Sequence, residues 1–345
     1  MTPPLTDPDS GPVRGMLTRS VAIHYVRVAL RGAGSRGADT TALLEQAGIP
    51  PELLEVERAR VSTEQFARLT KLLWDLLDDE LLGLAPQPNK VGTFAMMCHA
   101  VVHCPDLRSA LRRSADFYRL FPYGPRMFLT ESGDDASMIL DSGFDDPDHF
   151  VPEAALVVWH RFAGWLIRRR INLRRVEFAY PAPPHVLEYD LLFGAPAVFG
   201  AERTAAVFDA ALLDQPVLQD EAGLRSFLRR APADVLARID YGSTAAARVR
   251  RLLSRALPDR LPSLDEVAAS LSVSPPTLRR QLAAEGTSFQ QVRDQLRRDV
   301  AVAGLVGGRI SIEQLSAQLG FSEPSAFHRA FKRWTGSTPR SYQPG

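Results

Sequence analysis

The residues best suited to chemistry form two groups of arginine and small polar side chains near the C-terminus. The first group is Thr277, Arg279 and Arg280, and the second is Ser325, His328 and Arg329. In both groups these residues fall between apolar residues that recur at helical spacing, so they face outward from a short helix. An α-helix fits the roughly 12 Å wide major groove of DNA, where an arginine can pair with guanine through two hydrogen bonds. The two groups therefore indicate helices that read DNA.

The segments that must position these groups are copies of one pattern. The nine residues from Ser263 recur, in type and spacing, in the nine residues from Ser311, at an offset of 48. Both copies begin with a capping box, in which the serine is followed three positions later by Glu266 or Gln314. Apolar residues then follow at the spacing of one buried helical face. The repeat predicts two short, well-capped helices.

A second helix follows a tight turn in each copy. We expect it over Pro275–Glu285 in the first copy and over Glu323–Trp334 in the second, with Ser274 and Ser322 as the N-cap residues. Two short helices joined by a turn, with arginine on the outer face of the second, make a helix-turn-helix. Two such units in tandem are a far more specific signal of DNA binding than one alone.

One long helix is predicted between the two units, over Phe289–Val306. At 1.5 Å per residue it would span about 27 Å. A support of this length holds two recognition helices near one DNA turn apart, about 34 Å, so that they enter successive major grooves on one face of the duplex.

Charge is unevenly divided along the chain. Residues 241–345 contain 15 basic and 8 acidic residues, whereas residues 1–240 contain 26 basic and 32 acidic residues. A basic C-terminal part on an acidic body indicates a polyanion as the partner of that part. The hydrophobic fraction of 45% is typical of a globular protein, and no apolar run approaches the ~18 residues of a membrane helix.

Residues 263–343 resemble the DNA-binding domain of the AraC/XylS family of bacterial transcription regulators. The residues that carry the resemblance are Leu264, Val267, Ala268, Leu271, Ser274, Thr277, Leu278, Arg280 and Leu282 in the first unit, and Ile312, Leu315, residues 319–323, residues 325–336, Thr338, Pro339 and Tyr342 in the second. The DNA contacts that the resemblance implies are Thr277, Arg279, Arg280, Glu323, Ser325, His328 and Arg329. Pro275, Pro276 and Pro324 depart from the family, which often has polar base-reading side chains there. Fewer direct base contacts, or more readout of DNA shape, would follow.

The first two thirds of the chain predict a mixed α+β domain. Ser62–Leu84 is spaced as a long amphipathic helix, and Thr93–Phe121 as two helices separated at Cys104-Pro105. Arg126–Phe144 is typical of a β-hairpin, and Arg175–Tyr180 and Ala205–Phe208 of further strands. The expected fold class is an α+β N-terminal domain followed by an all-α C-terminal domain with two helix-turn-helix units.

We divide the chain into a disordered tail at 1–17, an effector-binding and dimerisation domain at 18–215, a helical connection at 216–262 and the DNA-binding domain at 263–343. The front domain resembles, less sharply, the ligand-binding domain that precedes this DNA-binding unit in one branch of the family. Landmarks of the resemblance include Ala47-Gly48-Ile49 and Pro105-Asp106-Leu107. The resemblance implies a small-molecule sensor that forms a homodimer.

The ligand-binding candidates are apolar residues on the predicted helices and hairpin of the front domain. They are Phe94, Met97, Tyr118, Phe128 and Trp159. Ordinary core packing is the alternative role for each. Their apolar character favours a hydrophobic or amphipathic effector such as a fatty acid.

Other motifs suggest different chemistry. Gly32–Gly37 matches the dinucleotide pattern G-x-G-x-x-G, but no second strand follows it, so a flexible glycine turn is the better interpretation. An alternative function is a metal- or redox-sensing regulator on the same scaffold, using Cys98, His99, His103 and Cys104. No nucleophile-elbow, zinc-protease or Walker A motif is present in the sequence, so we predict no catalytic residue. An enzyme with a DNA-binding tail is the least favoured interpretation.

The sequence therefore predicts a cytoplasmic transcription regulator rather than an enzyme. Its expected partners are double-stranded DNA, a small-molecule effector, a second copy of the chain and, if it is an activator, RNA polymerase. We expect no cofactor, no bound metal and no membrane association.

Overall fold

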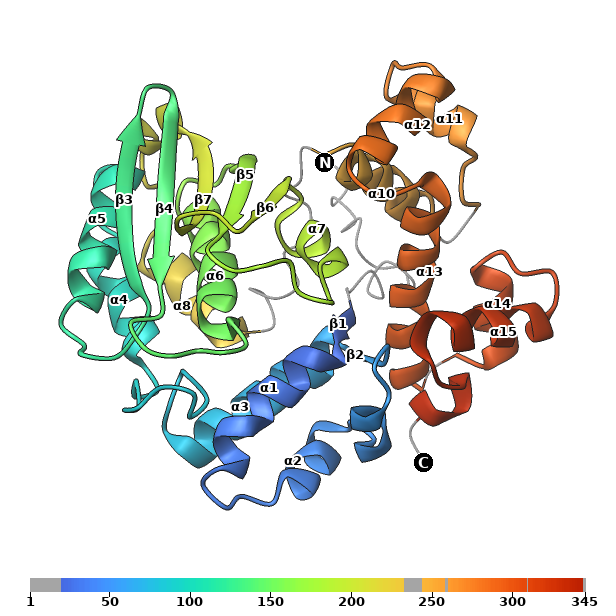
Figure 1. Ribbon diagram of the computed structural model, residues 1–345, viewed down its shortest axis with the longest axis horizontal. Coiled ribbons are helices and arrows are strands. Elements are labelled where there is room, and N and C mark those ends of the chain that lie inside the picture. The colour runs from blue at the N-terminus through green and yellow to red at the C-terminus, as the bar shows by residue number, and fades with distance from the viewer. Residues whose placement is uncertain (1–19, 233–243, 258–259, 309, 344–345) are drawn as a thin grey trace, which may run out of the picture. The chain divides into compact units, whose positions relative to one another are not determined.

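The computed structural model describes residues 20–232, 244–257, 260–308 and 310–343 (Figure 1). The predicted tail at 1–17 lies outside these residues. The α+β front and the helical rear of the predicted fold class are confirmed. Contacts between residues divide the chain into two compact units. The front unit contains residues 24–47 and 66–247, and the rear unit contains residues up to 23, 48–65 and 248–345.

The front unit is built on one five-stranded sheet. In spatial order its strands are β3 (Arg126–Ser132), β4 (Asp135–Asp141), β7 (Thr204–Asp209), β5 (Leu173–Phe178) and β6 (Ala197–Phe199). All neighbours are antiparallel except β5 and β6, which are parallel. The predicted hairpin is confirmed: Ser132 pairs with Asp135, and Gly133 takes the left-handed conformation, with φ +57°, that such a short turn requires.

The front unit also contains helices. They are α1 (Ile23–Gly34), α2 (Thr40–Ala47), α3 (Thr63–Leu77), α4 (Thr93–Val101), α5 (Leu107–Tyr118), α6 (Phe150–Leu166), α7 (Leu187–Phe193) and α8 (Glu221–Arg230). Of these helices, α5 and α6 pack on the sheet. The most buried of them is α6, which packs on β4 and β7 and has few exposed side chains. The predicted break at Cys104-Pro105 is confirmed, because Asp106 caps α5 by accepting a hydrogen bond from the Ser109 amide at 2.7 Å.

The amphipathic helix expected over Ser62–Leu84 is shorter than predicted, because α3 ends at Leu77. The buried carboxylate of Asp79 accepts hydrogen bonds from the backbone amides of Leu81, Gly83 and Asn89, at 2.8–3.0 Å. An aspartate that bonds nearby amides offers the backbone an alternative to the helix. The loop that follows α3 is consequently fixed in shape, and it borders the cavity described below.

The rear unit contains the predicted helical repeat. Its elements are η2 (Pro51–Glu55), α10 (Ala245–Ala256) from Arg248 onward, α11 (Leu264–Ser270), α12 (Pro275–Ala284), α13 (Phe289–Val306), α14 (Ile312–Gln318), α15 (Pro324–Thr335) and η4 (Pro339–Tyr342). Two short strands from the front of the sequence, β1 (Ser20–Ala22) and β2 (Arg60–Ser62), pair antiparallel and pack against α13. The rear unit is therefore assembled from both ends of the chain.

A buried carboxylate joins these distant segments. Asp299 of α13 is 1% exposed and forms an ion pair with Arg250 of α10. Its Oδ1 lies 3.9 Å from Arg60 Nε of β2, and it also accepts a hydrogen bond from the Ser20 hydroxyl of β1. Burial by itself would raise the pKa of Asp299, but the positive charges of Arg250, Arg298 and Arg60 outweigh it and lower the pKa to about 2. Asp299 is thus charged at neutral pH and compensated on several sides.

A second buried carboxylate lies in the core of the front unit. Glu153 of α6 accepts hydrogen bonds from three tyrosine hydroxyls: Tyr25 at 3.1 Å, Tyr180 at 2.7 Å and Tyr189. Burial raises the pKa of Glu153 to about 7, although the tyrosine hydrogen bonds lower it in part.

Replacing Asp299 is expected to destabilise the protein strongly. Asp299→Asn keeps the size of the side chain but leaves Arg250 buried without its counter-charge, which costs about 3–5 kcal/mol. The control is Asp294→Asn on the same helix, whose ion pair with Arg333 is partly exposed and 3.7 Å long, and which should cost less than about 1 kcal/mol. Urea unfolding followed by circular dichroism measures both. Equal losses in the two variants would contradict the structural role of Asp299.

Glu153 makes the stability of the protein depend on pH. Because its pKa is raised on folding, the folded state holds a proton that the unfolded chain releases, so this contribution is present below about pH 4.5 and is lost as pH rises to about 7. Glu153→Gln removes the titration. The free energy of unfolding of the wild type should therefore fall relative to that of Glu153→Gln, by up to about 3 kcal/mol, between pH 4.5 and 7.5.

The pH dependence of stability must be compared between the wild type and Glu153→Gln, because the wild type alone does not isolate the effect of Glu153. Burial lowers the pKa values of His160 and His185 to about 4, which makes stability rise with pH over much of the same range. These histidines are present in both proteins, so their effects cancel in the difference. Urea unfolding at each pH gives that difference, and a value that does not change with pH would contradict the assigned pKa.

Candidate nucleic-acid interface and ligand cavity

The first helix-turn-helix consists of α11 and α12. The predicted capping box is confirmed: the Glu266 amide donates to Ser263 Oγ at 3.3 Å, and the Ser263 amide donates to the Glu266 carboxylate at 2.7 Å. Ser274 is the N-cap of α12, as predicted, and accepts a hydrogen bond from the Thr277 amide. Leu278 and Leu282 of α12 are fully buried, so the opposite face of this helix is turned outward.

The second helix-turn-helix consists of α14 and α15. Its capping box, between Ser311 and Gln314, is also confirmed. The Phe321 ring, in the turn, lies 5.6 Å from the Phe327 ring and 5.0 Å from the Arg297 guanidinium of α13. The turn is therefore held both by its own unit and by the long helix.

The prediction that Ser322 caps this second helix was wrong, because the N-cap of α15 is Glu323. Glu323 has extended backbone angles, with φ −139° and ψ 138°, and makes no capping hydrogen bond through its side chain. The ring of Pro324 disfavours the helical conformation for the residue before it, and proline suits the first helical position. The helix therefore begins one residue later than the serine cap would allow.

The two units share one support. The predicted helix over Phe289–Val306 is confirmed as α13, and Ser288 caps it by accepting a hydrogen bond from the Gln291 amide. It connects α12 to α14 in the chain and packs directly against α14 and α15 (Figure 1). Both candidate recognition helices thus belong to one compact unit.

The candidate DNA contacts fall on the outer faces of α12 and α15. The exposed ones are Arg279, Arg280, Glu323, Ser325, His328 and Arg329. Thr277 is half-buried, and its hydroxyl lies 2.8 Å from that of Ser274. Within the described residues, Arg279, Arg280 and Arg329 take part in no ion pair, so their guanidinium groups are available to phosphates or base edges. Whether they contact DNA stays a prediction.

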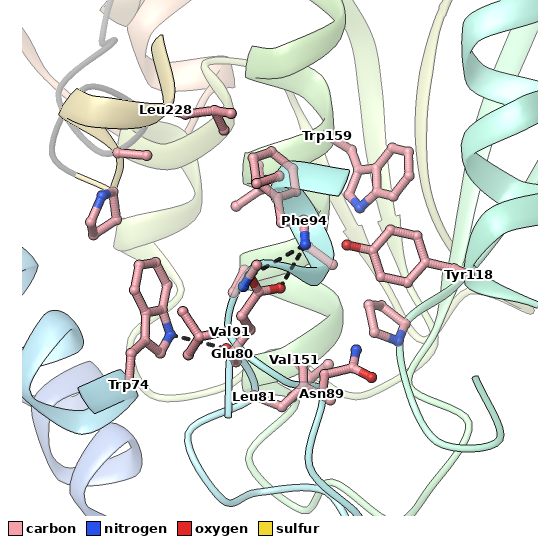
Figure 2. Close-up of a pocket in the computed structure, with 18 of the residues that line it drawn as sticks. Trp74, Glu80, Leu81, Asn89, Val91, Phe94, Tyr118, Val151, Trp159 and Leu228 are labelled. Carbon is pink, nitrogen blue, oxygen red and sulfur yellow. Dashed lines mark hydrogen bonds between the residues drawn. The ribbon is translucent and has the colours of Figure 1, made fainter. Parts of the chain in front are cut away.

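The front unit contains an apolar cavity of about 340 Å³ (Figure 2). Of the five predicted ligand-binding residues, Phe94, Tyr118 and Trp159 line it. Met97 is fully buried in the core, where its sulfur accepts a hydrogen bond from Ser114 Oγ at 3.2 Å. Phe128, on β3, is 46% exposed. The structure therefore brings three of the five together around one space, and ligand binding by any of them stays a prediction.

Glu80 supplies the cavity's acidic group, and sequence reasoning missed it. Its Oε1 accepts a hydrogen bond from the Gly92 amide, and its Oε2 one from the Phe94 amide, each at 2.9 Å (Figure 2). Burial raises the pKa of Glu80 to about 7, while these backbone hydrogen bonds lower it and the nearby Asp79 raises it. The sequence shows only an acidic run at 78–80, which is more often a solvated loop.

The four residues of the alternative function do not form a metal or disulfide site. His99 Nδ1 and His103 Nε2 each lie 3.1 Å from a carboxylate oxygen of Glu221. Cys98 and Cys104 are both buried and free. No group of three or more metal-ligating side chains is placed to hold a metal ion in the part of the chain that the structure describes. The metal- or redox-sensing interpretation is therefore not supported.

The glycine-rich motif has a packing explanation. Gly32 lies within α1, and a Cβ atom there would be 2.0 Å from the carbonyl oxygen of Leu82. Only glycine permits this approach of α1 to the loop after α3.

Among the described helices, none combines the length and apolar character needed to cross a membrane.

Comparisons with known proteins agree with this architecture. Residues 37–217 match the N-terminal arabinose-binding domain of AraC transcription regulators, and residues 267–344 match a helix-turn-helix domain. The ornithine utilization regulator of Pseudomonas aeruginosa is 28% identical over 326 residues, which cover 94% of this chain and 96% of that protein. An HTH-type transcriptional regulator of Mycobacterium tuberculosis is 29% identical over 332 residues, which cover 93% of this chain and 95% of that protein.

Among solved structures, the transcriptional regulator CdpR from Pseudomonas aeruginosa has 22% sequence identity to this chain. The match covers 93% of this chain and 97% of that one, with a TM-score of 0.32. The arabinose-binding match alone extends over more than half of the sequence, and the helix-turn-helix match follows it in the order found in AraC regulators. This chain belongs to the AraC family of DNA-binding transcription regulators.

Proposed function

We propose that this protein regulates transcription by binding a bipartite DNA site, with α12 and α15 in successive major grooves. The observation that carries the proposal is the pair of arginine-bearing helices, α12 and α15, that belong to one unit with the 18-residue helix α13. A helix of that length spans about 27 Å, and successive grooves on one face of B-DNA lie about 34 Å apart.

The proposed control signal is a small, largely apolar effector in the cavity of the front unit. Trp74 of α3 lines this cavity, and α3 follows β2 in the chain without a break, because Ser62 ends the strand and Thr63 begins the helix. Arg60 of β2 in turn faces Asp299 of α13. An effector that displaces Trp74 would therefore act on a helix that follows β2 directly in the chain.

Control of this kind is a shift between two states of the protein. The effector must bind one state better than the other, and the difference in affinity sets the change in DNA binding. A second copy of the chain would double the number of half-sites, and RNA polymerase would be a further partner of an activator. The resemblance to a regulator named for ornithine utilization supports a metabolic small molecule as the signal.

Arg280→Ala tests whether α12 reads bases. A site selected from a random duplex library by the full-length protein serves as the specific target. If Arg280 pairs with guanine through two hydrogen bonds, its removal should weaken binding to that site by about 1–3 kcal/mol. Binding to unrelated DNA of equal length should weaken far less. The affinities are measured at one stated salt concentration, because phosphate contacts make binding strongly salt-dependent.

Arg255→Ala is the matched control, since Arg255 is an exposed arginine of the rear unit that lies outside both recognition helices. It should weaken specific and unspecific binding equally, if at all. Equal losses for Arg280→Ala on the two DNAs would reduce Arg280 to a phosphate contact and would contradict base reading by α12.

A further inference from the structure

The described residues that line the cavity include one acidic side chain and no basic one. Most lining side chains are apolar or aromatic, including Trp74, Phe94, Phe150 and Trp159. Glu80 is the one acidic residue among the lining residues that the structure describes, and no lysine or arginine is among them. A ligand that enters this space therefore meets a carboxylate and no cationic side chain of the lining.

The Glu80 carboxylate is fixed in position rather than free to turn away. The Gly92 and Phe94 amides hold its two oxygens, and the Trp74 indole N–H donates to the Glu80 backbone carbonyl at 3.4 Å. A carboxylate has about four lone-pair positions, so these amides leave acceptor capacity unused. Within the described residues Glu80 has no ion-pair partner, and a desolvated anion without a counter-charge is unfavourable.

The aromatic side chains around the carboxylate suit a cation as well. Tryptophan and tyrosine rings attract ammonium groups through their negatively polarised faces, most strongly when water is excluded. Figure 2 shows the Tyr118 hydroxyl directed toward the middle of the pocket, near Phe94. No hydrogen bond of that hydroxyl is formed within the described part of the chain, so it is available to a polar group of a ligand.

We infer that the cavity binds an organic monocation, an apolar molecule that carries a single amino or ammonium group, with Glu80 as its counter-ion. A free fatty acid, which the apolar sequence pattern favoured, would instead bring a second carboxylate to Glu80. The cavity volume of about 340 Å³ lies in the usual range of small-molecule sites, about 300–1,000 Å³. The inference rests on the proposed function, in which this cavity is the effector site.

The test compares three molecules with one skeleton and different head groups: 4-phenylbutylamine, 4-phenylbutanol and 4-phenylbutyrate. Binding to the full chain is measured by calorimetry at pH 8, above the pKa of Glu80. We expect the amine to bind about tenfold more tightly than the alcohol, and the acid to bind most weakly. This order in the wild-type protein tests the inference without any substitution.

Glu80→Gln identifies the counter-ion. Glutamine has nearly the same size and keeps one oxygen that can accept a backbone hydrogen bond, but its amide nitrogen is a donor and the side chain lacks the charge. The amine should lose about tenfold in affinity, the alcohol should be unaffected and the acid should gain. Glu64→Gln is the matched control, because Glu64 is an exposed acid on α3, and it should leave all three affinities unchanged.

The outcomes separate this inference from the proposed function. Tighter binding of the acid or alcohol than of the amine would overturn the monocation while leaving the cavity as an effector site. Failure of all three molecules to bind, or equal loss of amine binding in Glu64→Gln, would also overturn it. The affinity of the same wild-type protein for its selected DNA site reports separately on the regulator function.

Discussion

The rear unit depends on one buried charge, the carboxylate of Asp299 in the middle of α13. Three of its partners are distant in the sequence, namely Ser20 and Arg60 of the two short strands and Arg250 of α10, and the fourth, Arg298, is its neighbour in the chain. A buried ion pair is not by itself a source of stability, because desolvation offsets much of the attraction. Its specific effect here is to fix which segments meet α13 and in what register. The recognition helices are placed relative to the rest of the unit by the helix that this carboxylate anchors.

Three carboxylates, the buried Asp299 and Glu153 and the half-buried Glu80, have different roles because their surroundings differ. Guanidinium groups hold the pKa of Asp299 near 2, so it stays charged and structural. Among the described residues Glu80 and Glu153 have no such neighbour, and burial raises the pKa of each to about 7. Glu153 is satisfied by three tyrosine hydroxyls within the core. Glu80 instead lines the cavity, so its remaining acceptor positions are available to a ligand.

Local signals in the sequence were sufficient to predict most of the helices of the DNA-binding region. The capping boxes at Ser263 and Ser311, and the limits of α13, follow from residue types a few positions apart. The same local reasoning failed where a proline or an acid intervened. Pro324 moved the N-cap of α15 to Glu323, and Asp79 ended α3 at Leu77 by bonding the amides of the following loop.

Other features lie beyond local reasoning because they depend on residues far apart. Arg60 and Asp299 are separated by more than two hundred positions, so no pattern in either neighbourhood shows that β2 packs on α13. The division of the chain at 18–215, 216–262 and 263–343 remains a prediction, while contacts group residues 48–65 with the rear unit. Phe94, Tyr118 and Trp159, which line the cavity, were among the predicted ligand-binding residues, but Glu80 was not, since its place at the cavity follows from the shape of a loop.

The central claim is that α13 sets a fixed distance between two groove-reading helices. The most direct measurement is the affinity of the full-length protein for selected sites in which the spacing between the two recognised elements is changed. Each added base pair increases the separation of the two DNA elements by about 3.4 Å and rotates one element relative to the other about the duplex axis. The account predicts that adding two base pairs lowers affinity toward that of random DNA, and that adding a full turn does not restore it. Unchanged affinity after either insertion would contradict it.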